Sequence, residues 1–200
     1  MLKTIVGTLI AQIGSRKIKG LGWTQENYRA KRENLTKAYE SLISIVNLFP
    51  NEGPGDIIKN IKYGPYYSLE NYNGVFHTLN NKIEDYEKQK SFSNLNYEKK
   101  NDIDVEISNI KYAKDKLDIN YKAYQKAVKD LDHFNSSDKA IFKLYAGKHV
   151  QNCLVNFEVI INNVFIAGML VSIPGSPFED GIKIAREELI NAMRNDIGTT

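Results

Sequence analysis

The feature that most constrains this chain is a long stretch with a helical repeat of apolar residues and no helix breaker. Between Asn96 and Phe134 there is no glycine or proline, so nothing removes a helical hydrogen bond or adds backbone freedom. Apolar residues recur there in two seven-residue series, interrupted only by a lysine. The first is Ile103, Ile110, Leu117, Tyr124 and Leu131, and the second is Ile107, Lys114, Tyr121 and Val128. The spacing predicts one helix over about residues 96–134 with a single apolar stripe.

A helix of this length is about 50–60 Å long, which exceeds what a compact domain of this size requires. Its stripe must therefore be covered by other helices, by a second copy of the chain, or by both. Tyr121 and Tyr124 lie in the stripe, and their hydroxyls need a hydrogen-bond partner or water. The prediction is an all-α fold, an elongated antiparallel bundle of five or six helices around the long helix.

Composition supports one folded domain with an N-terminal appendage. The chain has 200 residues, of which 42% are hydrophobic and 26% charged, so general disorder is excluded. We expect residues 1–22 to form an amphipathic helix with a glycine joint, and residues 23–200 to form the helical bundle. A net charge of +3 is too small to indicate a dedicated nucleic-acid binder, so no specific nucleic-acid partner is expected.

Local start and stop signals place the other helices. One is expected from Thr24 to Phe49, ended by Pro50, and another from Ser68 to about Tyr86. A further helix should follow Asp138 and continue to Ile173, apolar nearly all round from Val159 onward. Ser176-Pro177-Phe178-Glu179 reads as a capping box that starts the last helix, which ends near Gly198.

Residues 50–67 form the clearest loop. Six glycines and prolines punctuate it, yet it also carries three isoleucines and three tyrosines. An apolar loop of this kind either folds back onto the core or presents a surface to a partner, because exposed tyrosines favour protein contacts. The candidate binding residues are Tyr63, Tyr66 and Tyr67.

The N-terminal segment has one apolar helical face followed by a basic cluster. Three interpretations compete: a helix docked on the bundle, an interfacial membrane anchor, and a signal peptide or shortened membrane span. The apolar run is too short to cross a bilayer, which needs about 20 residues. The candidate membrane-contact residues are Leu2, Val6, Leu9, Ile13, Arg16, Lys17 and Lys19.

Catalytic and metal-binding patterns are sparse in the sequence. His149 and Cys153 are four residues apart and could supply half a zinc site, but no other pair has the spacing to complete it. The sequence has no glycine-rich phosphate loop and no nucleophile elbow. We therefore expect no metal, no cofactor and no catalytic residues. Cys153 is the single cysteine, interpreted as a small buried apolar residue in a protein of the reducing cytoplasm.

One alternative assigns chemistry to Lys143 and His149. HEPN-type RNases of bacterial defence and toxin systems carry an arginine and a histidine on one helix, separated by four to six residues. Lys143 and His149 resemble that pattern, with five residues between them. Lysine replaces the arginine here and cannot make the same bidentate phosphate contact. A packed surface histidine is the competing interpretation.

Two C-terminal segments resemble parts of uncharacterised bacterial all-helical proteins. They are Ile141 to Val150 (IFKLYAGKHV) and Arg186 to Gly198 (REELINAMRNDIG). The resemblance implies a bacterial helical protein and carries no assigned activity. Our leading hypothesis is a non-enzymatic helical interaction or structural protein that self-associates or binds a protein partner. The alternatives are the HEPN-like RNase and a peripheral membrane protein anchored by residues 1–19.

Overall fold

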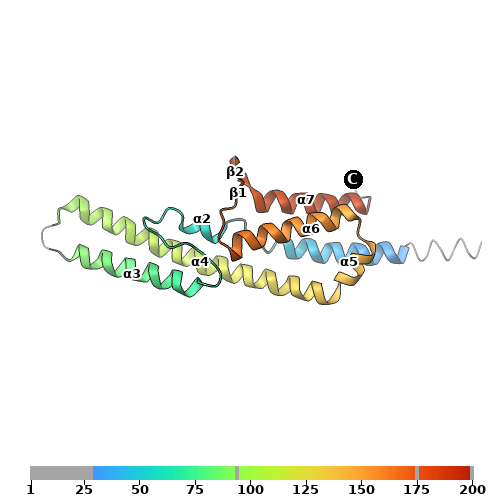
Figure 1. The fold of residues 1–200 in the computed structure, drawn as a ribbon, viewed down its shortest axis with the longest axis horizontal. Helices are drawn as coiled ribbons and strands as arrows, with labels where there is room; N and C mark the ends of the chain where they lie inside the picture. The colour runs from blue at the N-terminus through green and yellow to red at the C-terminus, as the bar shows by residue number, and fades with distance from the viewer. Residues whose placement is uncertain (1–28, 93–94, 174–175, 199–200) are drawn as a thin grey trace, which may run out of the picture.

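The computed structural model describes residues 29–92, 95–173 and 176–198. These residues form an elongated all-α molecule, with a helical hairpin at one end and a bundle at the other (Figure 1). The prediction of an elongated helical bundle around one long helix is thus confirmed. Residues 1–22, with every candidate membrane-contact residue, lie outside the described residues, so the interpretations of that segment stay predictions.

Helices account for most of the described chain. The first runs over residues 29–46 and is called helix 29–46 below. It is followed by α2 (Pro54–Ile58), α3 (Tyr72–Lys90), α4 (Tyr97–Ser137), α5 (Lys139–Tyr145), α6 (Lys148–Ile161), the π-helix η1 (Asn162–Ile166) and α7 (Gly181–Asp196). Between η1 and α7, β1 (Ser172–Ile173) and β2 (Ser176–Asp180) pair as a short antiparallel hairpin.

The long helix α4 has 41 residues, which corresponds to about 60 Å. It starts where predicted, because the Asn96 side chain accepts a hydrogen bond from the Lys99 backbone N–H at 3.0 Å. It continues one turn beyond the predicted end and is the only described helix that spans both ends of the molecule (Figure 1).

The core divides into two clusters along α4. The hairpin core joins the first half of α4 to α3 and to the connection around α2; it contains Ile58, Ile61, Tyr67, Val75, Leu79, Ile83, Ile103, Ile107, Ile110, Ala113 and Leu117. The bundle core joins the second half of α4 to helix 29–46, α5, α6, η1 and α7. Its largest fully buried side chains include Tyr39, Leu42, Phe134, Phe157, Phe165, Leu189 and Met193.

The predicted α4 stripe is only half right. Its first series is buried from Ile103 to Tyr124, whereas the second series is only partly buried after Ile107. A third series, three residues after members of the first, is buried in its place: Ala113, Asn120, Ala127 and Phe134. The stripe moves round the helix for two reasons. A straight helix drifts by about 20° per seven residues, and α4 serves two cores that lie on different sides of it.

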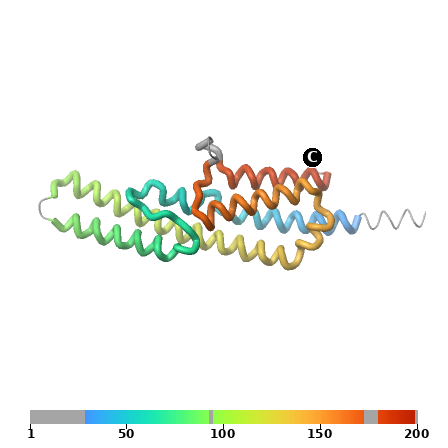
Figure 2. Tube along the Cα trace, in the orientation of Figure 1, coloured from blue at the N-terminus to red at the C-terminus, as the bar shows by residue number. Residues whose placement is uncertain are grey.

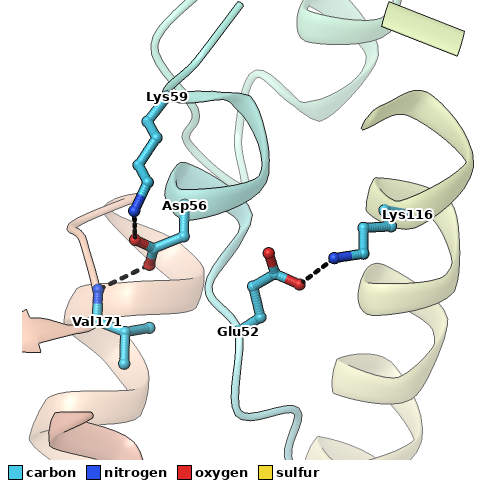
Figure 3. A network of polar contacts seen from close by, with 5 residues as sticks. All are labelled: Glu52, Asp56, Lys59, Lys116 and Val171. Carbon is cyan, nitrogen blue, oxygen red and sulfur yellow. Dashed lines mark hydrogen bonds and ion pairs between the residues drawn. The ribbon is translucent and has the colours of Figure 1, made fainter. Parts of the chain in front are cut away.

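The two cores meet where the segment after helix 29–46 crosses α4. Asn120 is the one buried polar side chain in the described part of the chain, and its Nδ2 donates to the Glu52 backbone carbonyl at 2.6 Å. Lys116, one turn earlier, forms an ion pair with the Glu52 carboxylate at 2.7 Å (Figure 3). Glu52 is therefore fastened to α4 through both its backbone and its side chain.

The same segment is also fastened to the chain after η1. One Asp56 carboxylate oxygen accepts from the Val171 backbone N–H at 2.8 Å, and the other pairs with Lys59 at 3.1 Å (Figure 3). Glycines allow the backbones to approach here. A Cβ on Gly55 would lie 2.4 Å from the Gly168 carbonyl oxygen, and one on Gly168, whose φ is +74°, would lie 2.1 Å from the Tyr67 carbonyl oxygen. Only glycine fits at these two positions.

Two predicted helix boundaries are wrong. The helix expected from Asp138 to Ile173 is interrupted at Ala146 and Gly147 and ends at Ile166. The interruption accommodates α7, because the Gly147 backbone N–H donates to the Asp196 carboxylate at 3.1 Å and a Cβ on Gly147 would lie 2.4 Å from that side chain. Three of the apolar residues that follow Ile166 are exposed: Ala167, Met169 and Leu170.

The Ser176 capping box is the second wrong boundary. Ser176 and Glu179 lie in β2, and α7 begins later, at Gly181. The Asp180 side chain caps α7 instead, accepting from the Lys183 backbone N–H at 2.9 Å. Pairing of Ser172 with Asp180 and of Ile173 with Ser176 holds the preceding residues in an extended conformation. A carboxylate placed directly before the helix replaces the serine cap.

Arg186 of α7 caps the C-terminal end of helix 29–46. Its Nε donates to the Val46 carbonyl at 3.0 Å and its Nη2 donates to the Phe49 carbonyl at 2.8 Å. A third hydrogen bond joins Nη1 to the Asn51 side chain. One guanidinium thus satisfies the carbonyl of the last helical residue and a carbonyl of the turn that follows the helix.

We expect Arg186→Met to lower the free energy of unfolding by about 2 kcal/mol, because it leaves two partly buried carbonyls without a charged donor. Urea unfolding followed by circular dichroism measures the change. Lys183→Met, an exposed substitution in the same helix, is the control and should change stability by less than about 0.5 kcal/mol. Equal stability of the two variants would contradict the capping role.

Candidate functional site: a surface of tyrosines and lysines

The three candidate tyrosines do not share one environment. Tyr63 and Tyr66 expose 84% and 97% of their surface, whereas Tyr67 is buried in the hairpin core. The two exposed rings are therefore available for contact, and the third anchors the loop. The loop thus packs against the core through Tyr67, and the interpretation of Tyr63 and Tyr66 as partner-binding residues stays a prediction.

The backbone around these tyrosines is held at several points. The Gly64 N–H donates to the Ile61 carbonyl at 2.8 Å, and the Leu69 N–H donates to the Ile166 carbonyl of η1 at 2.9 Å. Figure 2 shows this connection running from α2 back to the middle of the molecule, where α3 begins. The exposed tyrosines thus stand on a loop that is fixed at both sides.

Tyr63 has an unusual backbone conformation. Its φ of 55° lies in the left-handed region, the only such non-glycine residue in the described chain. This conformation costs an L-residue about 1–2 kcal/mol. The anchored residues on either side therefore hold Tyr63 in a conformation that the isolated loop would avoid, and this fixes the direction in which its ring leaves the backbone.

Lysines surround the Tyr63 ring. The Nζ of Lys62 lies 5.6 Å from the ring centroid, and that of Lys82, which comes from α3, lies 5.8 Å from it. Lys82 is also 5.9 Å from the Tyr86 centroid. These residues, with Asp85 and Gln89, line a shallow pocket of about 310 Å³. The site presents aromatic faces with two cations and one carboxylate.

Lys62, Lys82 and Tyr86 belong to this surface but were not predicted from the sequence. Lys82 follows Tyr63 by nineteen residues and reaches it only because α3 folds back along the connection. No spacing rule links a loop residue to a helix residue at that separation. The only local signal was Lys62, which directly precedes Tyr63.

Two tyrosines next to the loop resist ionisation, the buried Tyr67 and the half-buried Tyr72. Burial raises the pKa of Tyr67 from 10.0 to about 12, and burial also raises the pKa of Tyr72 to about 12. The Tyr72 ring stacks on Tyr121 of α4 at a centroid distance of 4.0 Å. Tyr121 is half-buried, which agrees with the expectation that its hydroxyl needs a hydrogen-bond partner or water.

Alkaline unfolding tests the anchoring role of Tyr67. A raised folded-state pKa gives stability that is fully present below about pH 10 and is lost as the pH rises through about 12. We expect the free energy of unfolding of Tyr67→Phe to fall less steeply with pH across this window than that of the unsubstituted protein. Urea unfolding at a series of pH values measures it. Tyr66→Phe, at an exposed position, should keep the original slope, and an unchanged slope in Tyr67→Phe would refute the role.

The structure places Lys143 and His149 on two helices. Lys143 lies in α5 and His149 in α6, on either side of the interruption at Gly147, and both side chains are exposed. The Cys153 Sγ lies 3.9 Å from both ring nitrogens of His149. Burial raises the pKa of the half-buried Cys153 thiol. Within the described residues, no group of three or more histidine, cysteine or acidic side chains could hold a metal ion.

Residues 141–150 and 186–198, the two segments that resemble uncharacterised bacterial helical proteins, meet at the end of the bundle. Asp196 accepts from the Tyr39 hydroxyl at 2.5 Å and from the Gly147 N–H, so it joins three helices. Nearby, Arg32 Nη2 donates to the Ile197 carbonyl at 2.6 Å. A depression of about 580 Å³ lies beside these contacts; its lining includes Lys31, Arg32, Tyr145, Asn195 and Asp196. Gly147 of the first segment and Asp196 of the second thus connect α6 and α7 to helix 29–46 through Tyr39.

Comparison with known proteins gave no match: no family model, no curated protein and no solved structure is similar to this chain at a significant level. Among the described helices, none combines the length and the apolar character that a membrane span requires.

Proposed function

We propose that this protein is a non-enzymatic interaction protein of the cytoplasm that binds a protein partner through the surface around Tyr63 and Tyr66. The observation that carries the proposal is two almost fully exposed tyrosines on a loop fastened to the core by Tyr67. Tyrosine is enriched among the residues that dominate binding energy at protein interfaces. A loop that is already ordered loses little conformational entropy when a partner binds.

The charges around the tyrosines favour an acidic partner. Lys62 and Lys82 lie at the Tyr63 ring, and Asp85 is the one acidic residue that lines the adjoining pocket. Lysine ammonium groups attract carboxylates, and the tyrosine rings offer apolar area with a polar hydroxyl. We therefore propose that the partner contributes a segment with acidic and apolar side chains.

A random peptide library selected against the full chain tests this function. We expect the enriched peptides to be acidic and to bind the Tyr63→Ser/Tyr66→Ser variant at least about tenfold more weakly, a difference of roughly 1.4 kcal/mol. Fluorescence anisotropy of the labelled peptides measures the affinities. The substitutions should leave the fold intact because both side chains are exposed.

Tyr97→Ser provides a matched control, since Tyr97 is also 84% exposed but lies at the start of α4. It should bind the selected peptides as the unsubstituted protein does. Peptides that bind all three proteins equally, or a selection that enriches basic peptides, would refute the proposed surface.

A further inference from the structure

The outer face of α4 carries a second row of apolar residues. Val105, Tyr112 and Ile119 are spaced seven residues apart and expose 51%, 62% and 67% of their surface. Each follows a buried residue of the first series by two positions, a rotation of about 200° on a helix. The row therefore points away from the hairpin core, and a seven-residue repeat is the pattern by which one helix packs along another.

Charged residues continue the row at both ends. Glu98 lies seven residues before Val105, and Lys126 lies seven residues after Ile119. Both are exposed, and neither belongs to the four ion pairs found within the described chain. The row thus reads acid, apolar, aromatic, apolar, base, with Tyr112 at its centre.

The row is complementary to a second copy of itself that runs in the opposite direction. In an antiparallel pair of α4 helices centred on Tyr112, a residue before Tyr112 faces the residue equally far after it in the other copy. Val105 then faces Ile119, and Glu98 faces Lys126, while the two Tyr112 rings meet at the two-fold axis. A two-fold interface of this kind uses the same patch on both subunits.

We propose that the protein self-associates as a two-fold dimer through this row, with the two α4 helices antiparallel. We assign a second copy of the chain to this face because the row itself contains both partners of each pair, Glu98 with Lys126 and Val105 with Ile119. A parallel arrangement would instead place Glu98 against Glu98 and Lys126 against Lys126, which is unfavourable. Only one position in each seven-residue repeat is apolar, so the dimer is a reversible one that depends on protein concentration.

Cysteine cross-linking tests the register. In a Cys153→Ser background, Tyr112→Cys should form a disulfide-linked dimer under mild oxidation. Val105→Cys alone and Ile119→Cys alone should remain monomeric, because each faces the other residue, whereas an equimolar mixture of the two should cross-link. Dimers of Val105→Cys or Ile119→Cys alone, or no cross-link in the mixture, would overturn the antiparallel arrangement.

Charge reversal provides an independent test of the same pairing. Glu98→Lys and Lys126→Glu should each weaken the dimer in sedimentation equilibrium, by about tenfold or more in dissociation constant. The double variant should recover it, and a mixture of the two single variants should form a mixed dimer. Failure of the double variant to recover association would overturn the proposal, because only the antiparallel pairing places residue 98 against residue 126.

The proposed dimer and the proposed partner surface can be refuted independently of each other. Added to the Tyr112→Cys protein, the Tyr63→Ser and Tyr66→Ser substitutions leave the α4 row intact, so the yield of disulfide-linked dimer should not change. Circular dichroism checks that each substituted chain keeps its helical content, which is expected because all the substituted positions on α4 are exposed.

Discussion

The crossing of residues 50–56 over α4 is the constraint on which the rest of the structure depends. A helix of this length cannot be buried along one side by a single small core, and here it is shared between two. Asn120 marks the boundary, because its amide is buried and bound to the Glu52 carbonyl. A buried amide without this partner would cost about 1–3 kcal/mol, so the contact fixes where the chain can cross.

The other segments take their positions from that crossing. Asp56 extends it to the Val171 backbone, and the close approach of Gly168 to Tyr67 brings the end of η1 against the loop that carries the tyrosines. The loop is therefore ordered by contacts from both directions. Two kinds of surface result: a basic aromatic surface beside α3, and an outer α4 face left uncovered because both cores lie on other sides of the helix.

Sequence patterns predicted the parts of the fold that local physics controls. The extent of α4 follows from a long stretch without glycine or proline and from its Asn96 cap. The sequence correctly predicted burial of most of the first apolar series of α4, but not which other residues of the helix are buried. Those residues depend on how distant segments pack around α4 to form two cores. The capping box at Ser176 was wrong for the same reason, since pairing with β1 and the Asp180 cap moved the start of α7.

The sequence likewise predicted only part of the candidate site. The loop with its tyrosines is visible in the sequence, but the burial of Tyr67 and the presence of Lys82 depend on how α3 folds back. The outer row of α4 did have a local signal. Val105, Tyr112 and Ile119 form a further seven-residue series, shorter than the two apolar series that predicted the stripe.

Hydrogen exchange of the α4 amides, resolved by residue, tests most directly whether the crossing joins the two cores. If the crossing joins the two cores, the α4 amides from Ile103 to Phe134 should exchange slowly as one continuous set, with no loss of protection around Asn120. Fast exchange confined to residues 114–124, between two protected halves, would show that α4 opens at the boundary and would contradict the account.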